Sequence, residues 1–276
     1  MIARLIGRRA LNYLLFLFIT VVAVGPFLWL ISTALKGPAD NIFSYPPKFI
    51  PNDFTLSNFA QVFDTVPFLR YYVNSMFVAA SVVVLNIVLG LMAAFPLSRI
   101  EFKGRRIIFL LILSTLMIPF QIAMIPLFVL AVEFGMRNTY IGLILPKAIF
   151  PFSVFILRQA FRTIPSSLEE SAIIYGAKSW QVLLYILTPL ARSSIAALTV
   201  FAFIFSWSDF LWPLILLEDQ MMYTIPVGVA KLQGTFTNNW RLISAGSILS
   251  IIPVVIIFAF AQKQFIKGAL AGSVKG

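Results

Sequence analysis

Residues 165–189 read PSSLEESAIIYGAKSWQVLLYILTP, and this stretch separates two strongly apolar segments of the chain. Ser167, with Glu170 three residues later, has the spacing of a capping box at the start of a helix. Gly176 suits the left-handed position that ends a helix, and Ser179 can cap the helix that follows. The stretch therefore predicts two short helices joined at a glycine and lying on a membrane surface.

The composition places this stretch in a membrane protein. The chain of 276 residues is 60% hydrophobic and 11% charged, with a mean hydropathy of +0.96. Soluble domains are about half apolar and a quarter charged, and an apolar run of roughly 20 residues can cross a bilayer core. We expect one domain over residues 1–276, an all-α polytopic helix bundle in the lipid bilayer. About six transmembrane helices are predicted, near residues 11–35, 71–98, 106–132, 139–161, 194–217 and 242–266.

The first apolar run follows a basic start, as it does in a secretory signal peptide. Residues 11–35 exceed the roughly 7–15 residues of a signal h-region, so an uncleaved first span is favoured. With the N-terminus inside, the inner segments carry fourteen Lys and Arg residues and the outer segments six, while Lys147 is left within the fourth run. Because basic residues mark cytoplasmic loops, both termini and residues 165–189 are predicted to be cytoplasmic.

Several classes of function are disfavoured by what the sequence lacks. The net charge of +11 does not favour nucleic acid, because basic residues beside spans serve to orient them. Cysteine and histidine are both absent, which removes disulfides, thiolate chemistry and most zinc sites. Neither a G-x-x-x-x-G-K-[ST] loop, an H-E-x-x-H nor a G-x-S-x-G motif occurs. The chain is therefore predicted not to be an enzyme, with no catalytic residue, no metal site and no cofactor of its own.

One acidic residue, Asp209, falls inside the fifth predicted span, where a charge marks either a pathway or an internal pair. Trp207, Phe210 and Trp212 beside it offer rings that could stack on a sugar, with Asp209 accepting hydroxyl hydrogen bonds. The alternative is a structural hydrogen bond between helices, with the tryptophans in an interfacial belt. The sequence leaves both interpretations open.

Three further polar residues within the predicted spans are candidates for a role. Lys147 is expected near the outer end of the fourth span, with its amine snorkelling to the interface. Asn74 and Gln121 are candidates for the substrate path, although hydrogen bonds between helices are the favoured interpretation for both.

The spacing within the 165–189 stretch also resembles a known motif. Residues 170–172 read ESA, Gly176 follows after three residues, and ILTP ends at Pro189. This resembles the EAA loop of permease subunits in bacterial ABC importers, which reads E-A-A, three residues, G, nine residues, I, one residue, L-P. Two departures are Ser171 in place of an alanine and Thr188 in place of the leucine before the proline.

Motifs elsewhere extend the resemblance over nearly the whole chain. They look like the maltose-type carbohydrate permeases, and more specifically like the six-span partner of that heterodimeric pair. The matching pieces are LMIPFQ at 116–121, NTY at 138–140, WSDFLWP at 207–213 and AGSVKG at 271–276.

The resemblance implies a permease subunit of an ATP-driven, binding-protein-dependent importer for a sugar or sugar-like solute, forming half of the translocation pathway in the bacterial cytoplasmic (inner) membrane. Implied partners are a second homologous permease subunit, an ATPase dimer and an extracytoplasmic solute-binding protein, with ATP and Mg²⁺ held by the ATPase. The loop of about residues 162–190 is then a cytoplasmic coupling helix that docks on the ATPase. Its implied coupling residues are Glu169, Glu170, Ser171, Ala172 and Gly176.

The loop 218–241 has an implied role as well, because the corresponding loop of the family enters the closed binding protein and helps to dislodge the sugar. Its flexible, polar part would be Gly228, Gln233, Gly234 and Asn238. The alternative function is an ion-coupled secondary transporter. Such proteins often show internal repeats and intramembrane acids, whereas this chain shows no repeat and offers only Asp209 as a strong intramembrane acid.

Overall fold

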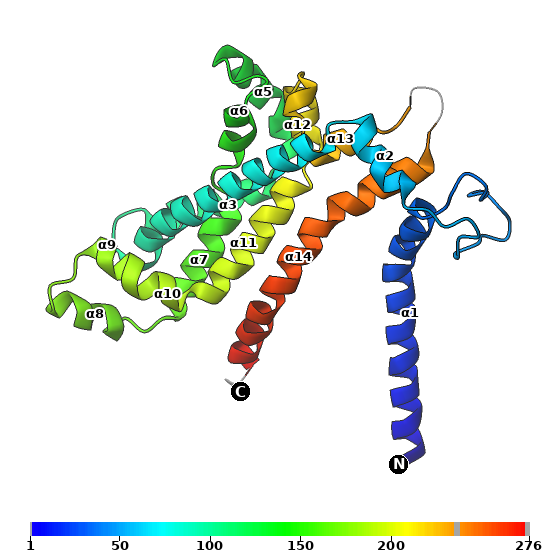
Figure 1. Cartoon of the computed structure of the whole chain (residues 1–276). Helices are drawn as coiled ribbons and strands as arrows, with labels where there is room; N and C mark the ends of the chain where they lie inside the picture. The colour runs from blue at the N-terminus through cyan, green and yellow to red at the C-terminus, as the bar shows by residue number, and fades with distance from the viewer. Residues whose placement is uncertain (1, 235–237, 274–276) are drawn as a thin grey trace. The chain divides into compact units, whose positions relative to one another are not determined.

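The computed structural model of the chain describes residues 2–234 and 238–273, and the side chains of residues 11–234 and 238–262. The predicted all-α class is confirmed, because the described residues form helices with one isolated antiparallel bridge between Lys36 and Phe54 (Figure 1). The longer helices are α1 (Ile2–Ala34), α2 (Ser57–Thr65), α3 (Phe68–Arg99), α4 (Arg105–Ser114), α5 (Phe120–Glu133), α7 (Pro151–Thr163), α8 (Ser167–Ile174), α11 (Arg192–Trp207) and α14 (Trp240–Ser273). The shorter elements are η1 (Thr115–Met117), α6 (Tyr140–Ile144), η2 (Leu145–Lys147), α9 (Ser179–Gln181), η3 (Val182–Leu187), α10 (Thr188–Leu190), α12 (Leu211–Leu216), η4 (Gln220–Met222) and α13 (Ile225–Ala230).

Three described helices are long and apolar enough to cross a membrane, and three bent helix pairs raise the number to as many as six. The straight candidates lie at Leu11–Ala34, Phe68–Arg99 and Trp240–Gln262. The bent pairs are Arg105–Met117 with Phe120–Glu133 (98°), Tyr140–Lys147 with Pro151–Thr163 (45°), and Ser179–Leu190 with Arg192–Trp207 (81°).

The predicted third and fourth spans, 106–132 and 139–161, correspond to the first two bent pairs, so each is a broken helix and not a straight one. Proline causes the first two breaks, because a residue before proline is pushed out of the helical region. Ile118 and Phe150, which precede Pro119 and Pro151, both have extended backbones. The fifth helix ends at Trp207 instead of running to residue 217, and α12 follows as a separate short helix.

The described chain divides into two compact units. The first contains the chain up to Phe68 together with Gly228–Ile252, and the second contains Leu69–Val227 and the chain from Pro253. The second boundary falls inside α14, at the proline that interrupts its backbone hydrogen bonding. Six of the basic residues that support the predicted orientation have side chains outside the described set: Arg4, Arg8, Arg9, Lys263, Lys267 and Lys275. The end of the AGSVKG motif also lies outside the described residues.

In the first unit, α1 and α3 are joined by a loop that contains one described helix, α2. The Nδ2 group of buried Asn58 donates to the carbonyls of Ala34 (2.8 Å) and Lys36 (2.9 Å). The Lys36 amine lies 4.4 Å from the centre of the Trp29 ring and donates to the Lys48 carbonyl at 2.6 Å. Side chains from both ends of the loop therefore satisfy its backbone groups.

In the second unit, an apolar core lies beneath the segment α8–α10. It draws residues from α3, α7, η3 and α11, so the short helices are seated on the spans. Its buried members are Leu91, Ala94, Leu157, Phe161, Val182, Leu187, Ala191 and Leu198.

Candidate coupling and pathway sites

The candidate coupling segment, residues 162–190, contains the predicted helix–glycine–helix arrangement. Gly176 has φ +86°, and its N–H donates to the Ile173 carbonyl at 2.9 Å. The N–H of Ala177 donates to the Ala172 carbonyl at 3.0 Å. These two bonds form a Schellman motif, which ends α8 by satisfying its last carbonyls. The predicted left-handed role of Gly176 is confirmed.

The predicted helix caps in this segment were wrong. Ser166 precedes α8 and Ser167 is already its first residue, with no side-chain cap bond at that end. The Ser171 hydroxyl instead donates to the Ser167 carbonyl at 2.7 Å. At α9 the cap position is Lys178, whose N–H donates to the Gln181 side chain at 2.8 Å, so Ser179 does not cap.

The two adjacent acids of α8 face opposite environments. Glu169 is buried and forms an ion pair with Arg99, with 2.6 Å between Oε1 and Nε. Burial raises the pKa of the Glu169 carboxyl, Arg99 opposes this by lowering it, and Glu170 raises it further. Glu170 itself is exposed. Only one of the two carboxylates is therefore available to a partner.

The outer side of the coupling segment is apolar and uncovered. Ile173, Ile174 and Tyr175 are exposed by 58%, 83% and 92%. A hollow of about 360 Å³ next to them is lined by residues on both sides of Gly176, including Ala172 and Tyr185. Apolar side chains in this number on a short surface helix are typical of a protein interface.

Asp209 and Lys147 form an ion pair inside the second unit. The Lys147 side chain is 2% exposed, so the predicted snorkelling of its amine to the interface was wrong. Each residue stands at a helix break: Lys147 ends η2 before α7, and Asp209 lies between α11 and α12. The Asp209 carboxylate also accepts a long bond from the Trp212 N–H (3.4 Å). The contacts agree with an internal structural pair, and a role for Asp209 toward a solute stays a prediction.

Asn86, which the sequence reasoning missed, supports the same break from the middle of α3. Its side chain is fully buried and donates to the Lys147 carbonyl at 2.7 Å. It accepts from the Phe150 N–H and from the Ser153 hydroxyl, both at 2.7 Å. These bonds satisfy backbone groups that the break in the helix leaves free. The available signal was an amide flanked on both sides by apolar residues within a predicted span.

The other predicted path residues lie in different settings. Trp207 and Trp212 are buried, the first stacked on Phe203 at 5.3 Å and the second donating to the Gly142 carbonyl at 3.0 Å. Phe210 and Gln121 are exposed. In this conformation the two tryptophan rings are covered, and their predicted role in a path stays untested.

Asn74 is confirmed as a polar link between segments. It donates to the carbonyls of Met221 (2.8 Å) and Tyr223 (2.9 Å) and accepts from the Tyr140 hydroxyl at 2.8 Å. Asn138, two residues before Tyr140, has φ +55° and accepts from the N–H groups of residues 218 and 219. The NTY motif thus holds the start of α6 against the loop after α12.

A cavity of about 520 Å³ lies at the two proline breaks. The rings of Phe150 and Phe205 meet edge to face with their centres 4.8 Å apart, and the ring centres of Phe152 and Phe201 are 4.5 Å apart. Gln121 contributes a polar side chain to the same cavity. Aromatic rings beside a few polar groups are a usual lining for a ligand path. The rings in this cavity differ from the tryptophans expected from the sequence.

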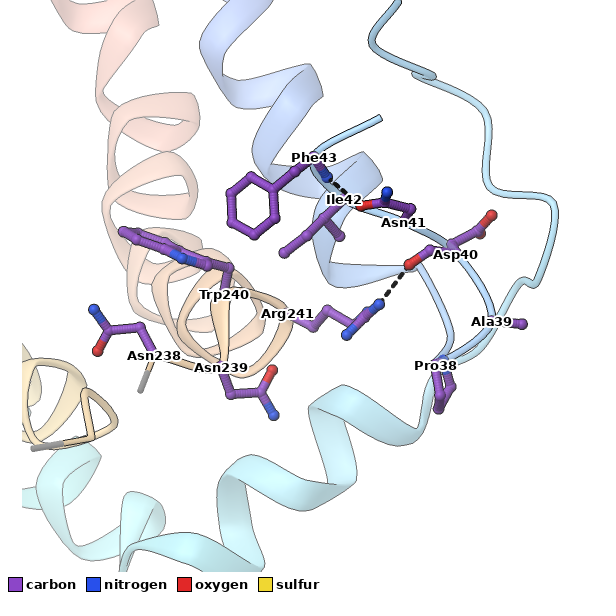
Figure 2. Close-up of a pocket in the computed structure, with 10 residues that line it drawn as sticks. All are labelled: Pro38, Ala39, Asp40, Asn41, Ile42, Phe43, Asn238, Asn239, Trp240 and Arg241. Atoms are coloured by element: carbon purple, nitrogen blue, oxygen red, sulfur yellow. Dashed lines mark hydrogen bonds between the residues drawn. The ribbon is translucent and has the colours of Figure 1, made fainter. Parts of the chain in front are cut away.

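The first unit has a second cavity, of about 490 Å³, between residues 38–43 and residues 238–241 (Figure 2). Arg241 reaches across it and donates to the Asp40 carbonyl at 2.5 Å. Trp240 and Phe43 are exposed by 46% and 75%. Of the four loop residues implied by the resemblance, Asn238 lines this cavity. Gly228 is buried in α13, and Gln233 and Gly234, which follow α13, are exposed.

Comparison with known proteins places these features in a family. Residues 86–269 match the family profile described as "Binding-protein-dependent transport system inner membrane component". The chain is 37% identical over 264 residues to the arabinooligosaccharides transport system permease protein AraQ of Halalkalibacterium halodurans, covering 95% of this chain and 94% of the relative. It is 33% identical to the melibiose/raffinose/stachyose import permease protein MelC of Bacillus subtilis, with 91% of each chain covered.

A solved structure agrees with these relatives. A chain from the crystal structure of a bacterial ABC transporter involved in the import of the acidic polysaccharide alginate matches with a TM-score of 0.84 and 25% identity. The match covers 94% of this chain and 96% of that chain.

Proposed function

The chain belongs to the binding-protein-dependent transport system inner membrane components, and from this premise we propose that it forms half of the translocation pathway of an ATP-driven sugar importer. It is a permease subunit of an ABC importer, and therefore a transport component and not an enzyme. The relatives are permeases of ABC importers, and none of these comparisons supports the alternative of an ion-coupled secondary transporter.

One observation carries the coupling part of this proposal. The segment 162–190 presents exposed Glu170, Ile174 and Tyr175 outward, and it rests on a core shared by three span helices. A partner that pushes on this surface moves the spans as packed bodies, which is the basis of a rigid-body switch. The proposed partner is an ATPase dimer that holds ATP and Mg²⁺, because this chain lacks a phosphate-binding loop.

The proposed solute is an oligosaccharide or disaccharide. Two named relatives, AraQ and MelC, carry sugar substrates in their names. The aromatic cavity at the proline breaks supports this class, because sugar rings pack against aromatic faces and Gln121 offers hydrogen bonds. A second, homologous permease subunit would complete the pathway.

The remaining proposals concern the two sides of the membrane. Both termini and the coupling segment are proposed to be cytoplasmic, on the distribution of basic residues. The cavity beside Asn238 and Trp240 is then extracytoplasmic, and we propose that the solute-binding protein contacts this surface.

The test is purification of the tagged chain from its native membrane, followed by identification of the proteins that accompany it. We expect an ATPase and a different permease. Uptake of labelled arabinotriose or raffinose by vesicles should then stop on ATP depletion and continue when ion gradients collapse. Recovery of the chain alone in a functional state, or uptake driven by an ion gradient, contradicts the proposal.

A further inference from the structure

We infer that Arg99 is the positioning residue of the coupling segment, because its guanidinium ties the first turn of α8 to the ends of α3 and α7. The inference rests on the proposed function, since coupling requires that α8 meet an ATPase. It assigns different tasks to the two adjacent acids, with Glu169 anchoring the helix and Glu170 facing the partner.

Three segments meet at this one side chain. Arg99 is the last residue of α3, and its Nη2 donates to the carbonyls of Phe161 (2.7 Å) and Ile164 (2.8 Å). These carbonyls belong to the last turn of α7 and to the residue after it. The Nε atom lies 2.6 Å from Oε1 of Glu169, in the first turn of α8. Only residues 164–166 separate α7 from α8, so the guanidinium spans the hinge between them.

Arginine suits this position for a physical reason. The last carbonyls of a helix lack partners within the helix and favour a nearby cation. A guanidinium offers several donors in a fixed plane, so it can bind two carbonyls and a carboxylate at once. A lysine at position 99 supplies a single charged point and cannot hold the same three directions. The geometry therefore uses the shape of Arg99 as well as its charge.

Because the Arg99–Glu169 pair is partly buried, it fixes the orientation of α8. The side chains of Arg99 and Glu169 are exposed by 15% and 10%. A partly buried carboxylate that loses its cation is strongly disfavoured, so Glu169 holds α8 in one orientation. Ala172, one turn further on, packs on the core and adds an apolar contact on the same side. The opposite side, with Ile174 and Tyr175, remains exposed.

The consequence is a direct mechanical link. Force applied to the exposed side of α8 reaches α3 through Arg99 and reaches α7 through the two carbonyls. Both α3 and α7 belong to candidate membrane spans. Without the link, α8 can rotate about residues 164–166 while the spans stay in place.

The experiment uses spin labels, because the chain contains no cysteine and introduced ones are unique. The pair Ser167→Cys and Lys103→Cys places labels at two exposed residues, the first residue of α8 and a residue after α3, and leaves the proposed docking residues Glu170, Ile174 and Tyr175 unchanged. Distances are measured by electron paramagnetic resonance in the purified complex with its partners, before and after trapping with ATP and vanadate. ATP hydrolysis is measured with and without the binding protein.

We expect a narrow distance distribution in the parent pair and a broad one in Arg99→Gln and Glu169→Gln. The stimulation of hydrolysis by the binding protein should fall about fivefold or more in both, as loss of a coupling free energy of about 1 kcal/mol requires. Arg106→Gln is the matched control, because Arg106 is an exposed arginine in the first turn of α4, outside the coupling segment. It should preserve both readouts.

A parental distance distribution and parental stimulation in Arg99→Gln overturn the inference. If Arg99→Gln fails to assemble, Arg99→Lys decides, since it keeps the ion pair and loses carbonyl bonds: a broadened distribution supports the inference and a parental one refutes it. Failure of the proposed function looks different. No ATPase would accompany the parent chain, whereas the distances within the chain would still report on Arg99.

Discussion

At the residue scale, Gly176 is the position of the coupling segment whose backbone conformation most strongly requires glycine. Its φ of +86° disfavours any side chain, although a Cβ there would meet no atom within 4 Å. Replacing it with valine therefore adds backbone strain of about 1–2 kcal/mol without a clash. We expect Gly176→Val to insert normally into the membrane and to abolish transport, measured as vesicle uptake.

The chain offers a matched control for this prediction. Gly104 also has φ +86° and open space around a Cβ, but it lies in the turn between α3 and α4. Gly104→Val should carry the same local strain and retain transport. Equal loss of transport in both variants would attribute the effect to strain in general, and transport by Gly176→Val would exclude its coupling role.

Asp40, in the loop after α1, predicts a pH dependence. Its carboxylate accepts from the N–H groups of Asn52 and Asp53, each as close as 3.0 Å. The bond from Asp53, the largest influence, lowers the pKa of Asp40 below its ordinary value of 3.8, and bonds from Asn52 add to this. A lowered pKa in the folded state stabilises the loop above the unfolded value, and this stabilisation is lost as pH falls through the folded value.

We therefore expect Asp40→Asn to speed hydrogen exchange of the Asn52 and Asp53 amides at pH 7, relative to the parent. The difference, corrected for intrinsic exchange rates, should shrink as pH falls below about 4. Asp64→Asn, a change at an exposed acid of α2, should have no effect on these amides. A difference that is independent of pH would rule out the carboxylate as its cause.

At the element scale, the Lys147–Asp209 pair joins two broken helices. Asp209→Asn leaves the 2% exposed Lys147 amine without its counter-charge, and loss of one partner of a buried pair costs about 3–5 kcal/mol. We expect a marked fall in the thermal midpoint of the purified complex. Because removing both charges avoids the stranded amine, Lys147→Met with Asp209→Asn should recover most of the stability.

The double variant separates the two interpretations of Asp209. Recovery of both stability and uptake identifies the pair as structural. Recovery of stability without uptake would instead show that transport needs a charge of this pair beyond its structural role. A double variant no more stable than Asp209→Asn alone would contradict the pairing itself.

At the scale of the whole molecule, the proposal assigns separable tasks to the two units. The cavity of the first unit presents Trp240 and Asn238, whereas the coupling segment belongs to the second. We expect Trp240→Ala to weaken the response of ATP hydrolysis to the binding protein and to leave hydrolysis without it unchanged. The response is measured by titrating the binding protein against the reconstituted complex.

The control for this prediction is Trp180→Ala, an equally large change at a 52% exposed tryptophan in the coupling segment. It should leave the concentration of binding protein that gives half the response unaltered. If Trp240→Ala has the same titration curve as the parent chain, the binding protein does not use this cavity.

The sequence by itself determined the class of the protein, because apolar runs of membrane length and the glycine of the coupling segment are local signals. Gly176 could be placed in a left-handed turn from its neighbours alone, and the ESA spacing located the segment. The helix breaks before Pro119 and Pro151 were visible as prolines, but their angles of 98° and 45° depend on packing.

Only the tertiary structure decided which polar residues meet. Lys147 and Asp209 are 62 positions apart, and Asn86 reaches the same break from another helix. The sequence could not say which of the two adjacent acids faces inward, because the face of a short helix that becomes buried depends on the residues packed against it. Arg99, 70 positions before Glu169, settles that choice, since burial requires a partner for one carboxylate and leaves the other free for solvent.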